Sequence, residues 1–189
     1  MSGPRGEFEI RRSRRRVPAA ERSALLVDPG FGRVFTDHMV TISYAEGKGW
    51  YDARVSARRP IPMDPATAVL HYAQEIFEGL KAYRTADGGV TLFRPEANAQ
   101  RFRDSATRMA MAQLPDELFL GSLEELIKVD QAWVPTDPEG SLQGQPPSQS
   151  LPRRSYHRSF RRSRNLRSPR LSISIQRPSS SPNAVGEPR

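Results

Sequence analysis

Hydrophobic and polar positions between residues 31 and 142 alternate in the way that short strands and amphipathic helices require. Residues 38–44 (HMVTISY) mix β-branched and aromatic residues with rough alternation, which predicts a strand. A turn over residues 45–49 lets residues 50–56 pair back as a hairpin. Residues 76–83 and 90–93 flank the turn sequence Ala-Asp-Gly-Gly, which predicts a second hairpin.

Helical periodicity follows in three places. Asp64-Pro65 resembles an N-cap followed by proline at the first helical position, and predicts a short helix over residues 66–72. Pro95 opens a helix through about residue 109, whose apolar stripe is Phe102, Ala106 and Met109. In a last helix, which ends before Pro135, Ser122 and Glu125 match a capping box and the apolar stripe is Phe119, Leu123, Leu126 and Ile127. These elements predict an α/β chain of the α+β type, with a mixed, mostly antiparallel sheet and packed helices.

The pattern changes abruptly after Leu142. Residues 143–189 contain 10 Arg, 11 Ser and 7 Pro, and too few apolar residues to repay the entropy of ordering. We expect a flexible arm over residues 1–22, a domain over 23–142, and a disordered Arg/Ser/Pro-rich tail over 143–189. A strand that should begin at Ser141-Leu142 is not expected to continue, although residues 171–175 alternate like a short, isolated strand.

The net charge of +8 is an average over two unlike parts. Residues 143–189 carry +9, whereas residues 1–142 carry −1, so the high isoelectric point reflects the tail. The chain has no cysteine, which excludes disulfides and thiolate metal sites, and its three histidines are scattered. No apolar run approaches the roughly 20 residues of a membrane helix. We therefore expect a cytoplasmic protein with no metal and no membrane partner.

Several blocks in order closely resemble the branched-chain amino-acid aminotransferases of bacterial type, which are pyridoxal 5'-phosphate (PLP) enzymes of fold type IV. The resemblance covers about residues 29–142. Its blocks are Phe31-Gly32, residues 35–39 (FTDHM), residues 70–72 (LHY), residues 76–83 (IFEGLKAY), residues 92–95 (LFRP) with Asn98 and Arg101, and residues 133–135 (WVP).

The resemblance implies a homodimer that transfers an amino group between leucine, isoleucine or valine and 2-oxoglutarate. It places Arg101 at the arginine that binds the PLP phosphate, a role that suits a guanidinium with several fixed donors. It also implies an apolar substrate pocket that includes Phe31, Tyr72 and Phe77. The alternatives are a surface arginine and ordinary core aromatics.

The chain departs from the family after Leu142. Gln143 and Gln145 stand where the family has the Tyr and Arg of Tyr-x-Arg-Pro. Lys48, Lys81 and Lys128 are the lysines of the chain, and none matches the Schiff-base lysine of the family. We therefore expect a truncated domain that is inactive alone, and we interpret the tail as a translation of an alternative reading frame.

Two other functions are open. Another fold type IV enzyme, such as a D-amino-acid transaminase or an aminodeoxychorismate lyase, would share the fold, but residues 35–39 and 77–81 favour the branched-chain group. A different class is suggested by residues 153–170, where Tyr156 and Phe160 are interleaved with arginines. That composition is typical of a disordered RNA-binding segment, and predicts weak, non-specific binding of nucleic acid at low salt.

Overall fold

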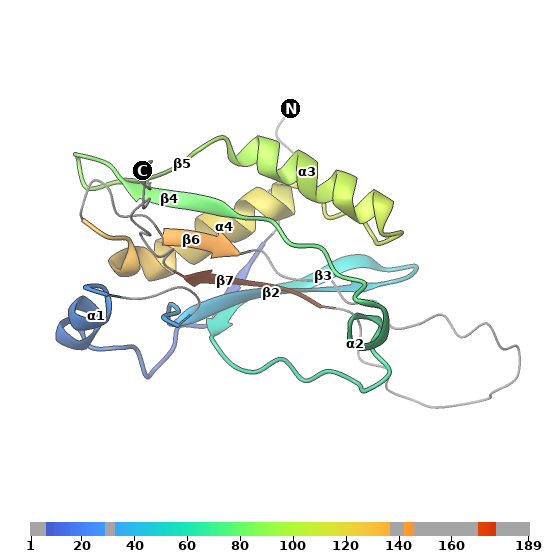
Figure 1. Ribbon diagram of the computed structural model, residues 1–189, viewed down its shortest axis with the longest axis horizontal. Coiled ribbons are helices and arrows are strands. Elements are labelled where there is room, and N and C mark those ends of the chain that lie inside the picture. The colour runs from blue at the N-terminus through green and yellow to red at the C-terminus, as the bar shows by residue number, and fades with distance from the viewer. Residues whose placement is uncertain (1–6, 29–32, 137–141, 146–169, 177–189) are drawn as a thin grey trace, which may run out of the picture.

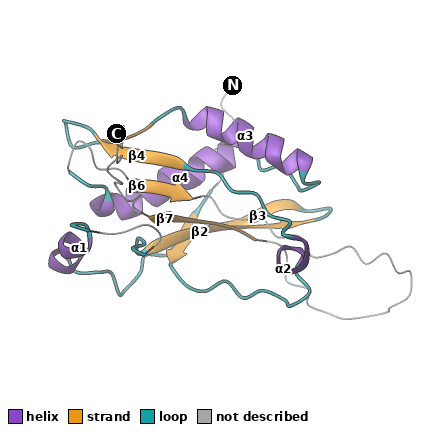
Figure 2. Ribbon diagram, in the orientation of Figure 1, coloured by secondary structure: helices purple, strands orange, loops and turns teal. Residues whose placement is uncertain are grey.

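A seven-stranded sheet with helices packed on it forms the body of the molecule (Figures 1 and 2). The computed structural model describes residues 7–28, 33–136, 142–145 and 170–176. The strands are β1 (Glu9–Ile10), β2 (His38–Ala45), β3 (Gly49–Ala57), β4 (Leu80–Arg84), β5 (Val90–Leu92), β6 (Leu142–Gln145) and β7 (Arg170–Gln176). The helices are α1 (Ala19–Leu25), α2 (Ala68–Tyr72), α3 (Pro95–Arg108) and α4 (Asp116–Asp130), and a 3-10 turn, η1 (Gln131–Trp133), follows α4.

The strand order is β1-β3-β2-β7-β6-β4-β5. Strand β1 is parallel to β3, and the other neighbouring strands are antiparallel. This arrangement confirms the mixed, mostly antiparallel sheet with packed helices that the sequence predicts.

Both predicted hairpins are present. Strands β2 and β3 pair from His38↔Ala57 to Ala45↔Gly49, and Gly47 in their turn has a φ of +81°. A bulge interrupts this ladder at Asp52, a non-glycine residue with a φ of +58° that adds one residue to β3. In the second hairpin β4 pairs with β5, and Gly88 of the turn has a φ of +82°, which glycine adopts without steric cost.

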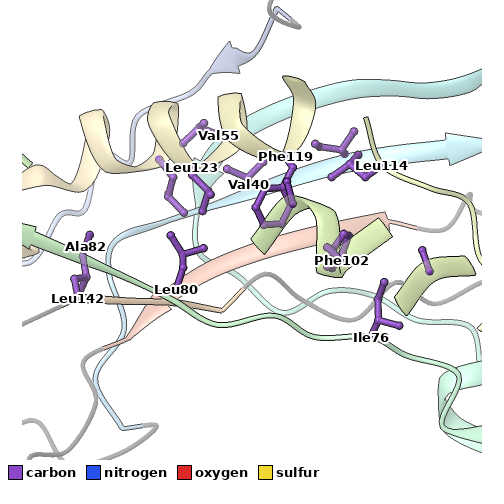
Figure 3. Close-up of a cluster of buried hydrophobic side chains, with 14 of the residues drawn as sticks. Val40, Val55, Ile76, Leu80, Ala82, Phe102, Leu114, Phe119, Leu123 and Leu142 are labelled. Atoms are coloured by element: carbon purple, nitrogen blue, oxygen red, sulfur yellow. The ribbon is translucent and has the colours of Figure 1, made fainter. Parts of the chain in front are cut away.

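The hydrophobic core lies between the sheet and helices α3 and α4 (Figure 3). Strands β2 and β3 supply Val40, Ile42 and Val55, all fully buried. Phe102 of α3 packs against Phe119 of α4 with ring centroids 5.4 Å apart. The helical stripes predicted from the 3.6-residue period therefore face the core, with Met109 and Ile127 partly buried at its margin.

Three local predictions need correction. Ser122 lies inside α4, which begins after Pro115, and its hydroxyl donates to the Phe119 carbonyl at 2.6 Å, so the capping box with Glu125 is wrong. The N-cap of α2 is Thr67 rather than Asp64, whose carboxylate instead accepts the Ala66 N–H at 2.8 Å. In place of a strand from residue 76, β4 begins at Leu80, because residues 76–79 form the loop that enters it.

The N-terminal segment also differs from the expected flexible arm over residues 1–22. Residues 7–22 contain strand β1 and the first part of α1. The Ser13 N–H donates to His38 Nε2 at 2.8 Å, and the Val17 N–H donates to Asp37 at 2.9 Å. These acceptors, His38 at the start of β2 and Asp37 just before it, hold the segment against the sheet, and Phe8 and Val17 pack against the core.

The tail contributes two strands. Strand β6 continues to Gln145 instead of ending at Leu142, so the predicted loss of this strand is wrong. Strand β7 includes the alternating residues 171–175 and lies between β2 and β6, pairing with both. Residues 170–176 are therefore not the disordered segment that composition predicts. Residues 146–169 and 177–189, which make up the rest of the expected tail, lie outside the described residues.

Candidate functional site

Arg101 extends from α3 to meet Glu78, which lies in the loop just before β4. Its Nε donates to Glu78 Oε2 at 2.9 Å, and its Nη2 donates to Glu78 Oε1 at 2.6 Å. The Arg101 side chain is 63% exposed, whereas that of Glu78 is 9% exposed. A nearly buried carboxylate thus fixes a mostly exposed guanidinium through a bidentate pair of hydrogen bonds.

The Glu78 carboxylate accepts two further hydrogen bonds, and a third joins Asn98 to the neighbouring Gly79. The Gly79 N–H donates to Glu78 Oε1 at 2.9 Å. Asn98 Nδ2 donates to the same oxygen at 3.2 Å and to the Gly79 carbonyl at 2.9 Å. Burial alone would raise the pKa of the Glu78 carboxyl, but the hydrogen bonds and charge of Arg101, with the Gly79 and Asn98 donors, hold that pKa below its ordinary 4.5. The carboxylate is therefore charged at neutral pH.

Arg101 retains unused donors. Its hydrogen bonds to Glu78, and their charge attraction, raise the pKa of its guanidinium, so the group stays positive. A guanidinium has five N–H donors, and Glu78 takes one on Nε and one on Nη2. Among the described residues no other group bonds to Arg101. The Nη1–Nη2 edge thus offers donors with fork geometry, which suits a phosphate or a carboxylate.

The two described aromatic residues of the expected pocket lie on the surface. Phe77 is 82% exposed and directly precedes Glu78, while Tyr72 is 60% exposed at the end of α2. This exposure excludes ordinary core packing for both side chains. Phe31 lies outside the described residues.

The lysines of the chain lie in other surroundings. The Lys48 ammonium stacks over the Tyr51 ring at 3.7 Å, and Lys128 pairs with Glu125 at 2.6 Å. Lys81 is exposed on β4. In the described part of the chain, no lysine joins the pair of Glu78 and Arg101.

Two kinds of site are absent from what the structure describes. No cluster of three or more His, Asp or Glu residues there could hold a metal ion. No helix within those same ranges has the length and apolar content to cross a membrane.

Sequence reasoning missed the role of Glu78 and Asn98 in this site. Both residues occur in blocks that carry the family resemblance, Glu78 in Phe-Glu-Gly and Asn98 three residues before Arg101. The i, i+3 spacing places Asn98 and Arg101 on neighbouring helical turns. Nothing local indicates that Glu78, 23 residues before Arg101, meets them.

Several curated proteins with similar sequences are described as branched-chain-amino-acid aminotransferases. The chain is 55% identical over 129 residues to a branched-chain-amino-acid aminotransferase of Mycobacterium tuberculosis. The aligned region covers 68% of this chain and 35% of that protein. Over these residues the chain is similar in sequence to proteins of this description. The enzyme of Mycolicibacterium smegmatis is 52% identical over 134 residues, covering 71% of this chain and 36% of the relative.

The chain spans about a third of the length of these aminotransferases. No protein-family model matches it. Among solved structures, a branched-chain aminotransferase from Thermoproteus uzoniensis with norvaline is similar with a TM-score of 0.49 and 15% identity, over 73% of this chain and 40% of that one.

Proposed function

We propose that this chain is the part of a branched-chain aminotransferase that binds the cofactor phosphate and forms one side of the substrate pocket. The observation that carries the proposal is the free edge of Arg101, held at the surface of α3 by Glu78. This donor set fits a phosphate, since the edge is charged, exposed and fixed in direction. The identity to enzymes of this description supports PLP as the source of that phosphate.

The proposed reaction moves the amino group of leucine, isoleucine or valine to 2-oxoglutarate. PLP, when bound, supplies the carbonyl group that takes up and returns the amino group. Phe77 and Tyr72 would contact the branched apolar side chain, because large exposed aromatics bind apolar groups at small cost in side-chain entropy. Phe31, a domain over residues 23–142, a homodimer and a cytoplasmic location belong to the same proposal on the strength of the resemblance.

Transamination by this chain alone is not part of the proposal. The proton transfers of transamination require a lysine at the cofactor, and Lys48, Lys81 and Lys128 have other surroundings. We expect no turnover of leucine with 2-oxoglutarate, and no lysine–PLP bond after borohydride reduction. A trapped lysine would contradict this part of the proposal.

Equilibrium binding of PLP and of pyridoxal, which lacks the phosphate, tests the phosphate site. We expect the wild-type chain to prefer PLP, and Arg101→Met to lose about ten- to a hundredfold of the affinity for PLP but not for pyridoxal. Arg108→Met is the matched control, since Arg108 is an exposed arginine on the same helix, about 10 Å along its axis. Equal affinity of the wild-type chain for PLP and pyridoxal would contradict the proposed phosphate site.

A further inference from the structure

We propose that Glu78 is a positioning residue for the anion site, which it sets by orienting the guanidinium of Arg101. This inference rests on the proposed function, in which Arg101 binds the PLP phosphate. Glu78 does not touch the phosphate in this proposal. It acts through Arg101, whose guanidinium it holds so that one edge stays free and points away from the Glu78 carboxylate.

The atoms used by the pair carry the inference. A guanidinium offers two edges with parallel N–H donors, Nε–Nη2 and Nη1–Nη2. Glu78 occupies the first edge with both of its oxygens, at 2.9 and 2.6 Å. A phosphate oxygen pair can therefore approach only along the second edge, which has a fixed direction relative to α3.

The anchor is itself rigid. Glu78 Oε1 accepts from the Gly79 N–H and from Asn98 Nδ2, and Asn98 also bonds to the Gly79 carbonyl. The loop before β4 and helix α3 are thereby joined through one buried carboxylate. An arginine on an exposed helix surface otherwise samples many rotamers, and a ligand would have to stop that motion when it binds.

A simple charge argument predicts the opposite effect. The Glu78 carboxylate is negative and lies beside the site of a dianion, so its removal would strengthen binding if net charge were decisive. If orientation is decisive, removal of the carboxylate weakens binding. The sign of the change therefore separates the two explanations.

The experiment measures PLP and pyridoxal affinity for the full chain with Glu78→Gln, which removes the charge, and with Glu78→Asp. Asp keeps the charge but is one methylene too short to hold both donors, so it also tests the inference if the Gln variant does not fold. Glu125→Gln is the matched control, because it removes a carboxylate from an exposed ion pair with Lys128 on α4. Arg101→Met and the double variant Glu78→Gln/Arg101→Met complete a double-mutant cycle.

We expect Glu78→Gln and Glu78→Asp each to weaken PLP binding by about two- to tenfold, the cost of immobilising one flexible side chain. The affinity for pyridoxal should not change. Glu125→Gln should leave the affinity for PLP as in the wild-type chain, and adding Glu78→Gln to Arg101→Met should not weaken PLP binding further. In ¹⁵N NMR spectra, the Arg101 Nε–H should exchange more rapidly with water in both Glu78 variants than in the wild-type chain.

Two results overturn the inference, and they are distinguishable. Unchanged or tighter PLP binding by the Glu78 variants, with the wild-type chain still preferring PLP to pyridoxal, would refute orientation by Glu78 and leave the proposed function intact. No preference for PLP in the wild-type chain would refute both proposals.

Discussion

His38 illustrates how one buried side chain can organise three distant segments. Its Nε2 accepts the Ser13 N–H at 2.8 Å, so the imidazole proton lies on Nδ1 and is donated to Asp130 Oδ1 at 2.6 Å. The His38 backbone N–H donates to the other oxygen of Asp130 at 3.0 Å. Both side chains are fully buried, and together they join the N-terminal segment, β2 and the end of α4.

Replacement of Asp130 by Asn should destabilise the fold. Asn keeps the shape of the side chain but has one carbonyl oxygen in place of two, so one of the two His38 donors loses its acceptor in a buried position. We expect the free energy of unfolding to fall by about 1–3 kcal/mol, as measured by urea denaturation. Asp104→Asn, at an exposed position on α3, is the control and should change it by less than about 0.5 kcal/mol. Equal effects of the two substitutions would contradict this role of Asp130.

The pair of Glu78 and Arg101 should make stability depend on pH. The pKa of Glu78 is lower in the folded chain than its ordinary 4.5, so the folded state favours the charged carboxylate. The resulting stabilisation is present above pH 4.5 and is lost as the pH falls through the folded pKa. Urea unfolding of wild type and Glu78→Gln should therefore differ more at about pH 7 than at about pH 3. A difference that stays constant with pH would contradict the shift.

The sequence could predict the phosphate-binding role proposed for Arg101, but not the contact of its guanidinium with Glu78. The motif around residues 92–101 identifies the arginine, and helical periodicity places it away from the buried stripe of α3. The contact with Glu78 depends on how the loop before β4 packs against α3, which is a tertiary property. For the same reason the partners of His38, in β2, could not be found from three scattered histidines.

Strand β7 joins two parts of the sheet. On one side lie β1, β3 and β2, and on the other β6, β4 and β5. The backbone of β7 pairs Ile173 with Val40 of β2 and Ile175 with Gly144 of β6. One short segment therefore provides backbone hydrogen-bond partners for both neighbouring strands. Within the described ranges, the two halves of the sheet share no other strand pairing.

Proline at position 173 should disrupt this junction. Ile173→Pro removes a backbone donor from the interior of a sheet, where proline is poorly tolerated. We expect a loss of about 1–3 kcal/mol in the free energy of unfolding. Amide exchange should accelerate over residues 40–43, which pair with β7, but not over residues 98–106 of α3. Ile173→Val is the control, and unchanged protection of residues 40–43 in the proline variant would contradict the pairing.

At the scale of elements, apolar periodicity was the strongest guide. The core stripes of α3 and α4 and the hairpins follow from periods of 3.6 and 2 residues. Element ends were less predictable, since Ser122 and Glu125 match a cap by spacing but lie inside a helix. Strand β7 was identifiable by alternation alone, and its place between β2 and β6 was not, because strand order depends on distant pairing.

At the scale of the whole molecule, the net charge is divided unevenly along the chain. Residues 1–142 carry −1 and residues 143–189 carry +9, so an anion such as PLP has two possible destinations. One is the fixed edge of Arg101, and the other is the arginine-rich stretch over residues 153–170, which lies outside the described residues. The same stretch would account for weak binding of nucleic acid.

NMR titration of the ¹⁵N-labelled full chain with PLP tests most directly whether the Arg101 site binds the cofactor. We expect saturable shifts at the amides of Glu78 and Gly79, at the Asn98 side chain and at the Arg101 Nε–H, with pyridoxal producing much smaller ones. Inorganic phosphate should shift the same resonances more weakly. Shifts confined to residues 153–170, with Glu78 and Arg101 unaffected, would contradict a phosphate site in the domain.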